Sequence, residues 1–514
     1  MKKILATAIM GWSISMSIAQ ATAKLSVYAD NPKTQISRHI YSHFSEHLGR
    51  CIYDGFWVKD SMNVPKTDRL RTDIIDALKK IQIPSLRWPG GCFADEYHWR
   101  DGIGPRNQRP SMVNTNWGNV AEDNSFGTHE FLELCGLLNC EPIVTGNVGS
   151  GTVEEMNKWV EYMNFDGQSP VTEMRKQNGH PAPFNVHFWG VGNESWGCGG
   201  NMSPEYYASE YKRYATFCKN YPNAKLKKIA SGASDFNYNW TDVMMKSVPL
   251  DMMWGLSLHY YTLPTGNWQD KGSATQFAEK EYFNTMQRCL RMDEVVTKHS
   301  TIMDKYDPDK KVSLVVDEWG VWTNTEPGTN PAFLYQQNSM RDALVAGSTL
   351  NIFNNHADRV RMANLAQTVN VLQAVILTQG KQMLLTPTYY VFDLYKVHQD
   401  AMLLPININT PDYVVDGQKI PAVNASASID SNKTVHITLV NLDASKTIKI
   451  STSFSGVSFK NVTGKIVTSA KFNDYDTFEN PNKIVEKEFS GAKKEGENVT
   501  ANLPPLSVVM LELK

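Results

Sequence analysis

The chain has 514 residues, of which 41% are hydrophobic and 20% are charged, and its formal net charge is −2. This composition is typical of a globular protein. The near-neutral net charge argues against a strongly basic protein that binds nucleic acids or anionic membranes. A chain of this length exceeds one ordinary core, so a large α/β barrel with a smaller second domain is expected.

Residues 1–23 have the features of a secretory signal peptide. Lys2 and Lys3 precede a short, mostly apolar stretch, and Ala21-Thr22-Ala23 fits a small-residue cleavage pattern. The stretch is too short, and too rich in Ser and Gly, for a membrane anchor. We therefore expect an exported mature protein, periplasmic or extracellular, without a membrane-spanning segment.

Eight apolar, strand-like runs alternate with helical patterns between about residues 39 and 390. The runs are His39–Glu46, Pro84–Gly90, Pro142–Val148, Val186–Glu194, Lys228–Ala233, Trp254–Tyr261, Val312–Glu318 and Arg359–Gln367. Amphipathic segments between them include Asp73–Ile81, Thr152–Met163 and Pro204–Lys219. Eight such units predict a (β/α)8 barrel over residues 39–389. An open doubly wound sheet is disfavoured, because no Gly-rich phosphate fingerprint follows the first strand.

The pattern changes after residue 390 to short strands separated by Asn, Asp, Gly, Ser and Pro turns. The predicted strands include Thr434–Val440, which alternates strictly, and Thr447–Ser451, Gly464–Thr468 and Ser507–Leu513. Such a pattern is typical of an antiparallel β-sandwich, here residues 390–514. A further strand-like run, Ala23–Tyr28, begins the segment 24–38 and is expected to pair with this sandwich.

Seven cysteines give an odd count, and their spacing matches no zinc motif. A disulfide framework is not expected for so large a chain, although a single bridge stays open if the compartment is oxidising. The cysteines are Cys51, Cys92, Cys135, Cys140, Cys198, Cys218 and Cys289.

Two glutamates end apolar strand-like runs and are followed closely by Gly and Trp. They are Glu194 in Gly192-Asn193-Glu194-Ser195-Trp196 and Glu318 in Val316-Asp317-Glu318-Trp319-Gly320. Burying a carboxylate is costly unless it is paired or used. Placed after strands 4 and 7 of a barrel, the pair indicates acid/base and nucleophile chemistry on a sugar, with the outcome set by the separation of the two carboxylates.

Other polar residues fall at the same ends of the predicted strands: Glu46, Arg87, His259, Tyr261 and Gln367. Some of these residues also have a plainer interpretation. Glu46 fits a structural carboxylate beside His43 or His47, and Arg87 fits either a bidentate partner of a carboxylate or a structural ion pair. Asn193 is suited to a sugar 2-hydroxyl, or with Glu194 to capping a helix.

Three further carboxylates are expected to carry less chemistry. Asp95, Glu96 and Asp101 fall in a loop, where they are expected to be solvated or to structure that loop. His259 lacks the spacing and the company of a zinc ligand and is expected to form a hydrogen bond near Glu318.

The order of the motifs resembles glycoside hydrolase family 51, the retaining α-L-arabinofuranosidases. The matching segments run through nearly the whole mature chain: residues 40–50, Arg87-Trp88-Pro89-Gly90-Gly91, residues 97–105, Gly192-Asn193-Glu194, Asp317-Glu318-Trp319, residues 365–371 and Thr477-Phe478-Glu479-Asn480-Pro481. Any one of these motifs alone would be weak, but their number and order make the match specific.

The resemblance implies roles for individual residues. Glu194 is expected to be the acid/base and Glu318 the nucleophile. The residues expected to hold the arabinofuranosyl ring are Glu46, Arg87, Cys92, Asn193, Tyr261 and Gln367. Trp117 and Trp322 are expected at the rim of the site. Cys92 departs from the Asn most common at its position, which puts its contact to a hydroxyl in doubt.

The resemblance also implies the substrate and the assembly. We expect an exo-acting hydrolase that releases terminal arabinofuranose from arabinoxylan, arabinan and their oligosaccharides, requires no cofactor or metal and forms a homo-oligomer. The alternatives are another retaining barrel glycosidase, such as an endo-glucanase or xylanase, and a non-catalytic sugar-binding protein. The presence of both carboxylates argues against a non-catalytic sugar-binding protein.

Overall fold

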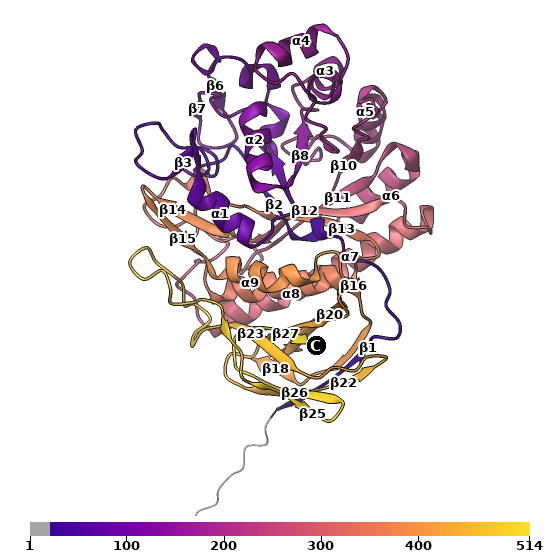
Figure 1. The fold of residues 1–514 in the computed structure, drawn as a ribbon, viewed down its shortest axis with the longest axis vertical. Coiled ribbons are helices and arrows are strands. Elements are labelled where there is room, and N and C mark those ends of the chain that lie inside the picture. The colour runs from indigo at the N-terminus through magenta and orange to yellow at the C-terminus, as the bar shows by residue number, and fades with distance from the viewer. Residues whose placement is uncertain (1–20) are drawn as a thin grey trace, which may run out of the picture.

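Eight parallel strands close into a barrel in the computed structural model, which describes residues 21–514 (Figure 1). In order around the barrel they are β2 (Ser42–Phe44), β5 (Ser85–Trp88), β8 (Glu141–Gly146), β9 (Phe188–Val191), β10 (Lys227–Ser234), β11 (Gly255–Thr262), β12 (Ser313–Val321) and β13 (Val360–Ala366), which pairs with β2. Each overlaps one of the eight predicted runs, so the barrel prediction is confirmed.

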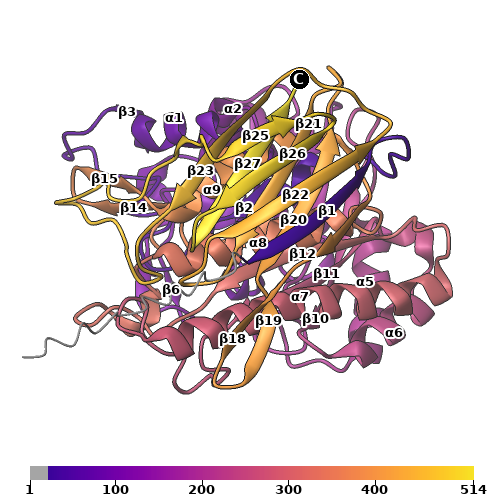
Figure 2. The same cartoon turned by 90° about the horizontal axis from the view of Figure 1, so that it is seen from below.

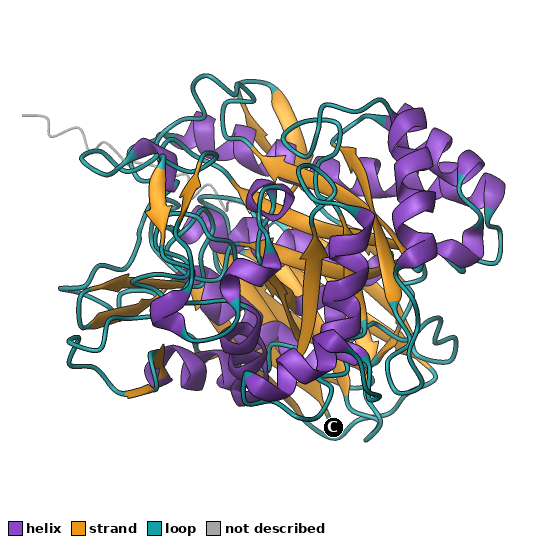
Figure 3. Cartoon of the chain, turned by 90° about the horizontal axis from the view of Figure 1, so that it is seen from above, coloured by secondary structure: helices purple, strands orange, loops and turns teal. Residues whose placement is uncertain are grey.

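Helices surround the barrel strands (Figure 3). Several begin where the sequence offers a cap: Thr152 accepts from the Glu155 amide, and Ser203 accepts from the Tyr206 amide with Pro204 at the first turn. The helices are α1 (Thr72–Lys80), α2 (Thr128–Leu138), α3 (Val153–Asn164), α4 (Pro170–Gln177), α5 (Pro204–Phe217), α6 (Tyr238–Ser247), α7 (Glu279–Tyr306), α8 (Met340–Asn355) and α9 (Pro387–Tyr395).

Two packed sheets form the second layer of the molecule, on the far side of α8 and α9 from the barrel (Figure 1). The six-stranded sheet has the order β16 (Met402–Leu403), β20 (Val423–Ile429), β21 (Val435–Asn441), β27 (Ser507–Leu513), β23 (Val462–Thr468) and β24 (Lys487–Glu488). The five-stranded sheet has the order β17 (Ile406–Asn409), β1 (Thr22–Tyr28), β22 (Ile448–Ser455), β26 (Asn498–Leu503) and β25 (Ala492–Glu495).

Short β-hairpins are attached to both layers. They pair β3 (Lys66–Thr67) with β4 (Leu70–Arg71), β6 (Met112–Asn114) with β7 (Val120–Glu122), β14 (Ile376–Gln379) with β15 (Gln382–Leu385), and β18 (Asp412–Val415) with β19 (Gln418–Pro421). The β6–β7 hairpin carries the loop from which Trp117 reaches the barrel mouth.

The N-terminal strand β1 joins the sandwich, as the sequence predicts (Figure 2). It pairs antiparallel with β17 but parallel with β22, so the sandwich is not purely antiparallel. Ala23 is already buried in this strand, although the signal-peptide prediction puts it on the removed segment. Residues 1–20 of that predicted peptide lie outside the described residues.

Helix α8 joins the barrel to the sandwich through buried polar side chains. The Ser426 and Thr438 hydroxyls donate to Asn351 Oδ1 at 2.8 and 2.7 Å, and Tyr41 donates to Asn354 Oδ1 at 2.6 Å. The alternating pattern of β21 therefore does not mark a solvated face, because α8 covers its polar side, including Thr438.

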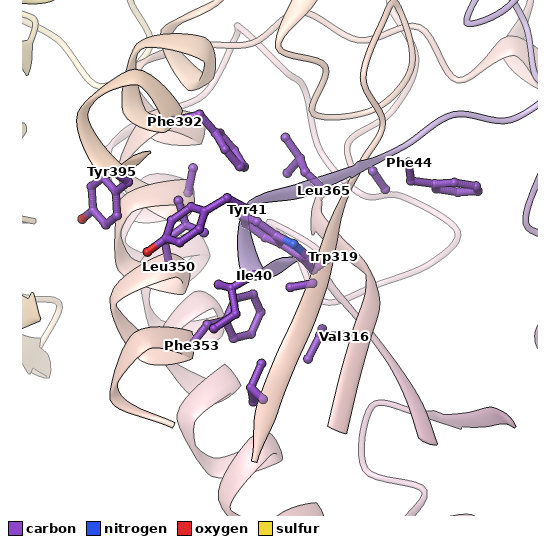
Figure 4. Packing of buried hydrophobic residues seen from close by; sticks show 14 of the residues in the cluster. Ile40, Tyr41, Phe44, Val316, Trp319, Leu350, Phe353, Leu365, Phe392 and Tyr395 are labelled. Carbon is purple, nitrogen blue, oxygen red and sulfur yellow. The ribbon is translucent and has the colours of Figure 1, made fainter. Parts of the chain in front are cut away.

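Apolar packing on the outside of the barrel holds the last strands in place. Figure 4 shows Trp319 among side chains of α8 and α9, and its ring lies 5.5 Å from that of Phe353 in an edge-to-face arrangement. Successive strand residues point to opposite faces, so anchoring Trp319 outside directs the neighbouring Glu318 towards the barrel axis.

Within residues 21–514, the helices lack any apolar stretch of the length that a bilayer span requires. The proposed boundaries at residues 38 and 389 remain predictions.

Replacing Asn351 by Ala should destabilise the junction between the two layers. Two buried hydroxyls would lose their acceptor, which costs about 2–3 kcal/mol of unfolding free energy. Denaturant unfolding of the variant, with the exposed turn substitution Asn432→Ala as control, measures this. An unchanged midpoint for Asn351→Ala would contradict the account.

Candidate active site

The carboxyl ends of the barrel strands enclose one pocket that contains most of the predicted site residues. Nine of the eleven predicted side chains line it, and the other two, Arg87 and His259, contact its carboxylates directly. The lining residues are Glu46, Leu48, Gly91, Cys92, Trp117, Asn193, Glu194, Tyr261, Glu318, Trp322, Leu334, Gln367 and Leu372.

Glu194 and Glu318 face each other in this pocket. One carboxylate oxygen from each, together with a ring nitrogen of His259, lie within 4.8 Å of one another. The two carboxylates therefore share one cavity, as strand ends 4 and 7 of a barrel predict.

Glu318 is held at both oxygens by hydrogen-bond donors. Arg87 Nη1 donates to Oε1 at 3.0 Å, and the Tyr261 hydroxyl donates to Oε2 at 2.8 Å. Burial raises the pKa of Glu318, while the positive charges of His259 and Arg87 oppose that rise. Its side chain is 8% exposed, and its orientation is fixed before a substrate arrives.

Glu194 is more open and is held on one side. Its side chain is 19% exposed, and its Oε1 lies 2.8 Å from His259 Nδ1. Its backbone has φ 39°, in the left-handed region that non-glycine residues rarely adopt. Such strain is typical of functional positions, and here it turns the carboxylate into the pocket immediately after β9.

His259 links three acids. Its Nε2 lies 3.2 Å from Asp317, while its Nδ1 lies 2.8 Å from Glu194 and 3.5 Å from Glu318. Burial disfavours the charged ring, but Glu318 and Asp317 outweigh it and raise the pKa of His259 well above its usual value. The sequence predicts a hydrogen bond of His259 near Glu318, and in the structure the closest partner of His259 is Glu194 rather than Glu318.

The Arg87 guanidinium contacts three residues, and its Nη1 donates to the Asp317 carbonyl at 3.3 Å as well as to Glu318. Nη1 reaches Glu318, while Nη2 donates to Asn193 Oδ1 at 2.7 Å. The bidentate contact to one carboxylate is therefore wrong. The Arg87 side chain instead fixes the position of Glu318, the candidate nucleophile, relative to the side-chain amide of Asn193, which directly precedes the candidate acid Glu194.

Glu46 is buried and bonded, but not to the histidines of the plainer interpretation. Its Oε1 accepts from the Trp117 indole at 2.9 Å and the Phe93 amide at 3.0 Å, and its Oε2 accepts from Gln367 at 3.1 Å. Burial, with the nearby charge of Glu318, raises the pKa of Glu46 to about 7.

Asn193 does not cap a helix, since the next one, α5, has Ser203 as its cap. The backbone amide of Asn193 donates to Asp95 Oδ2 at 2.9 Å, and Asp95 Oδ1 accepts from the backbone amides of Val148 and Gly149. Asp95 is therefore loop-structuring as expected, but it is buried rather than solvated. Burial raises its pKa to about 7.

The Pro89-Gly90-Gly91 turn brings backbone against the acids. A β-carbon on Gly91 would lie 2.9 Å from Glu318 Oε1, and one on Gly90 would lie 3.0 Å from Glu46. Any larger residue at either position would displace a carboxylate, which explains the two glycines.

Cys92 forms a disulfide with Cys198, so it has no thiol hydrogen for a sugar hydroxyl. The bridge ties the loop after β5 to the loop after β9, and the Cys198 sulfur lies 3.5 Å from Glu194 Oε2. The single bridge left open by the sequence is thus present beside the acid candidate.

Among residues 21–514, two groups of side chains come close enough to share a metal ion, but neither suits one. Cys92 and Cys198 are joined to each other, which leaves Glu194 alone in the first group. The second group is Glu194, His259 and Glu318, where the Arg87 guanidinium at 3.0 Å already supplies the positive charge.

Sequence reasoning missed Asp317, Asp95 and Cys198 as parts of the site. Strand alternation sends Asp317 and Glu318 to opposite faces, yet both meet His259. The pairing of β12 with β13 shifts register between Val316 and Trp319, and such an irregularity redirects side chains. The sequence does contain a signal for Asp317, because this carboxylate lies directly beside Glu318 in the Asp317-Glu318-Trp319 motif.

Family models match two parts of the chain. Residues 77–285 match "Alpha-L-arabinofuranosidase 1 domain" and residues 317–507 match "Alpha-L-arabinofuranosidase C-terminal domain". Over all 514 residues the chain is 52% identical to the intracellular exo-α-L-arabinofuranosidase of Bacteroides ovatus, covering 100% of this chain and 99% of that protein.

Solved structures agree. The GH51 arabinofuranosidase of Xanthomonas axonopodis pv. citri superposes with a TM-score of 0.95 at 49% identity, covering 96% of this chain and 100% of that one. The α-L-arabinofuranosidase of Thermotoga maritima, solved as an arabinose complex, gives 0.84 at 30% identity, covering 96% and 99%.

These similarities contradict the prediction of export. The Bacteroides ovatus relative is described as intracellular, and its alignment spans this whole chain, including the residues interpreted as a signal peptide. A basic start, a short apolar stretch and small residues do not suffice here to identify a secreted protein, and that prediction is wrong.

Replacing Glu46 by Gln should alter how stability depends on pH. An ordinary glutamate ionises near 4.5, but folded Glu46 holds its proton to about 7, so folding stability falls by about 3 kcal/mol as pH rises between those values. The variant should lose this part of the fall. Denaturant unfolding at pH 5 and pH 8, with exposed Glu497→Gln as control, measures it, and equal falls in all three proteins would refute the assignment.

Proposed function

The chain belongs to the family 51 α-L-arabinofuranosidases, exo-acting glycoside hydrolases, and on that premise we propose that it cleaves arabinoxylan, arabinan and their oligosaccharides with retention of configuration. The observation that carries the mechanism is the approach of Glu194 and Glu318 oxygens to within 4.8 Å. Retaining enzymes hold their carboxyl groups about 5–5.5 Å apart, whereas inverting enzymes leave about 6.5–9.5 Å for a water.

In the first step Glu318 attacks the anomeric carbon. The bond to the leaving oxygen breaks as that oxygen takes a proton from Glu194, and a covalent arabinosyl ester forms on Glu318. Arg87 and Tyr261 support this role, because their donors orient the attacking carboxylate. The more exposed Glu194 is accessible to the departing group.

In the second step a water replaces the leaving group. Glu194 accepts its proton, the water oxygen bonds to the anomeric carbon, and the ester bond to Glu318 breaks. Both carboxylates then return to their starting states. His259 contacts Glu194 and Glu318, so its charge stabilises whichever of them is ionised in each step.

The remaining pocket residues hold the terminal sugar. Glu46, Asn193 and Gln367 present oxygens and amides suited to furanose hydroxyls. Trp117 and Trp322 supply flat apolar walls. Cys92 shapes the pocket through its bridge rather than through a thiol contact.

The family relationship also supports assembly into a homo-oligomer. Light scattering of the purified protein tests this, and a monomeric mass at micromolar concentration would contradict it.

Removing each catalytic carboxylate should have a different signature. Glu318→Ala should abolish turnover of every arabinofuranoside, because no ester can form. Glu194→Ala should lower kcat/KM on natural oligosaccharides by about 10²–10⁴, but by less on a dinitrophenyl arabinofuranoside, whose leaving group needs little protonation. Steady-state kinetics with the exposed substitution Glu497→Gln as control measures both. Equal losses for Glu194→Ala on the two substrates would reject its role.

Stereochemistry tests retention directly. Proton NMR during hydrolysis of an aryl α-L-arabinofuranoside should show the α-anomer of arabinose first, with the β-anomer appearing only by mutarotation. If the β-anomer appears first, the double-displacement mechanism is wrong.

A further inference from the structure

An aromatic ladder leads outward from the pocket. Its first ring, Tyr261, donates to Glu318; the second, Trp322, lies 4.8 Å from Tyr261 in an edge-to-face contact. The third, Trp268, lies 5.3 Å from Trp322, also edge to face. We call these three side chains the aromatic ladder.

The last ring of the ladder is open to solvent. Trp268 is 46% exposed, and Lys271 Nζ lies 5.7 Å from its ring centre and 5.6 Å from that of Trp322. Single exposed apolar side chains are common on proteins. This one differs because it continues a series of rings that begins at a catalytic carboxylate.

The loop that carries Trp268, between β11 and α7, is fixed to the end of β12. Lys271 donates its amide to Asn324 Oδ1 at 3.0 Å, and the Asn324 side chain donates to Asp270 at 2.8 Å. The Asn324 amide also donates to the Gly272 carbonyl at 2.9 Å. The indole is therefore presented by a braced loop, so less ordering is needed on binding.

We propose that Trp268, with Lys271, forms a binding subsite for a sugar ring beyond the one directly attached to the terminal arabinose. This inference rests on the proposed function. The pocket encloses one terminal sugar, so a ring that reaches Trp268 must belong to the chain on the leaving side of the scissile bond. The ligand is a neutral glycan chain, whose C–H face packs on the indole while hydroxyls accept from Lys271 Nζ.

The proposal makes chain length the variable that reveals the subsite. A nitrophenyl group attached to arabinose extends the substrate by one ring, towards Trp322. Arabinan-derived oligosaccharides of two to five sugars extend it progressively further. Only the longer ones place a ring on Trp268.

The test compares wild type with Trp268→Ala, Trp268→Phe and Phe217→Ala on these substrates. Phe217 is 48% exposed at the far end of α5, which makes it a matched control for removal of a surface aromatic. Trp268→Ala should keep kcat/KM on nitrophenyl arabinofuranoside within about twofold and lower it about 3- to 10-fold on three sugars or more. Trp268→Phe should retain most of the length dependence, and Phe217→Ala should match wild type.

Two results would overturn the inference in different ways. Losses for Trp268→Ala that are equal on all substrates, or absent at every length, would exclude the subsite while leaving the proposed function intact. Wild-type protein that does not cleave nitrophenyl arabinofuranoside would overturn the proposed function, and this inference with it.

Discussion

Sharing of two buried cations among several buried carboxylates is the constraint on which the site depends. Arg87 contacts Glu318 and Asn193, while His259 contacts Glu194, Glu318 and Asp317. A buried carboxylate without such partners would take up a proton and lose its charge. The same contacts also fix distances, because each cation touches groups from different strands. Charge balance and geometry are thus set by one network, and neither can be changed alone.

The barrel supplies that network by bringing distant segments to one rim. Its register irregularities next to His259 and after Val316 turn acids inwards that a regular strand would divide between two faces. On the outer surface, packing of Trp319 against α8 and α9 resists any rotation of that strand. The sandwich contributes at a distance, because it covers the other side of α8 and so supports the packing behind Glu318.

Prediction from the sequence succeeded where a local pattern has a single physical cause. Buried parallel strands are continuous apolar runs, so all eight were found, and strand ends located Glu194 and Glu318. It failed where contacts join distant loops: neither the Cys92–Cys198 bridge nor the bonds of Asp95 leave a trace in spacing. The parallel pairing of β1 was equally hidden, because a strand's own residues do not encode its neighbour's direction. Export was misjudged because a terminal pattern reports composition rather than destination.

The position of β1 has a consequence for biosynthesis. Lys24 is opposite Asn409 on one side and Ser451 on the other, so β1 waits for partners that are translated long after it. At ribosomal rates of about 5–20 residues per second, that wait lasts roughly 20–80 s. Throughout it the apolar stripe of Ala23, Leu25 and Val27 has no sheet to enter. The barrel can close during that interval, but the unpaired edge of β1 must be kept from aggregating until β17 and β22 have been translated.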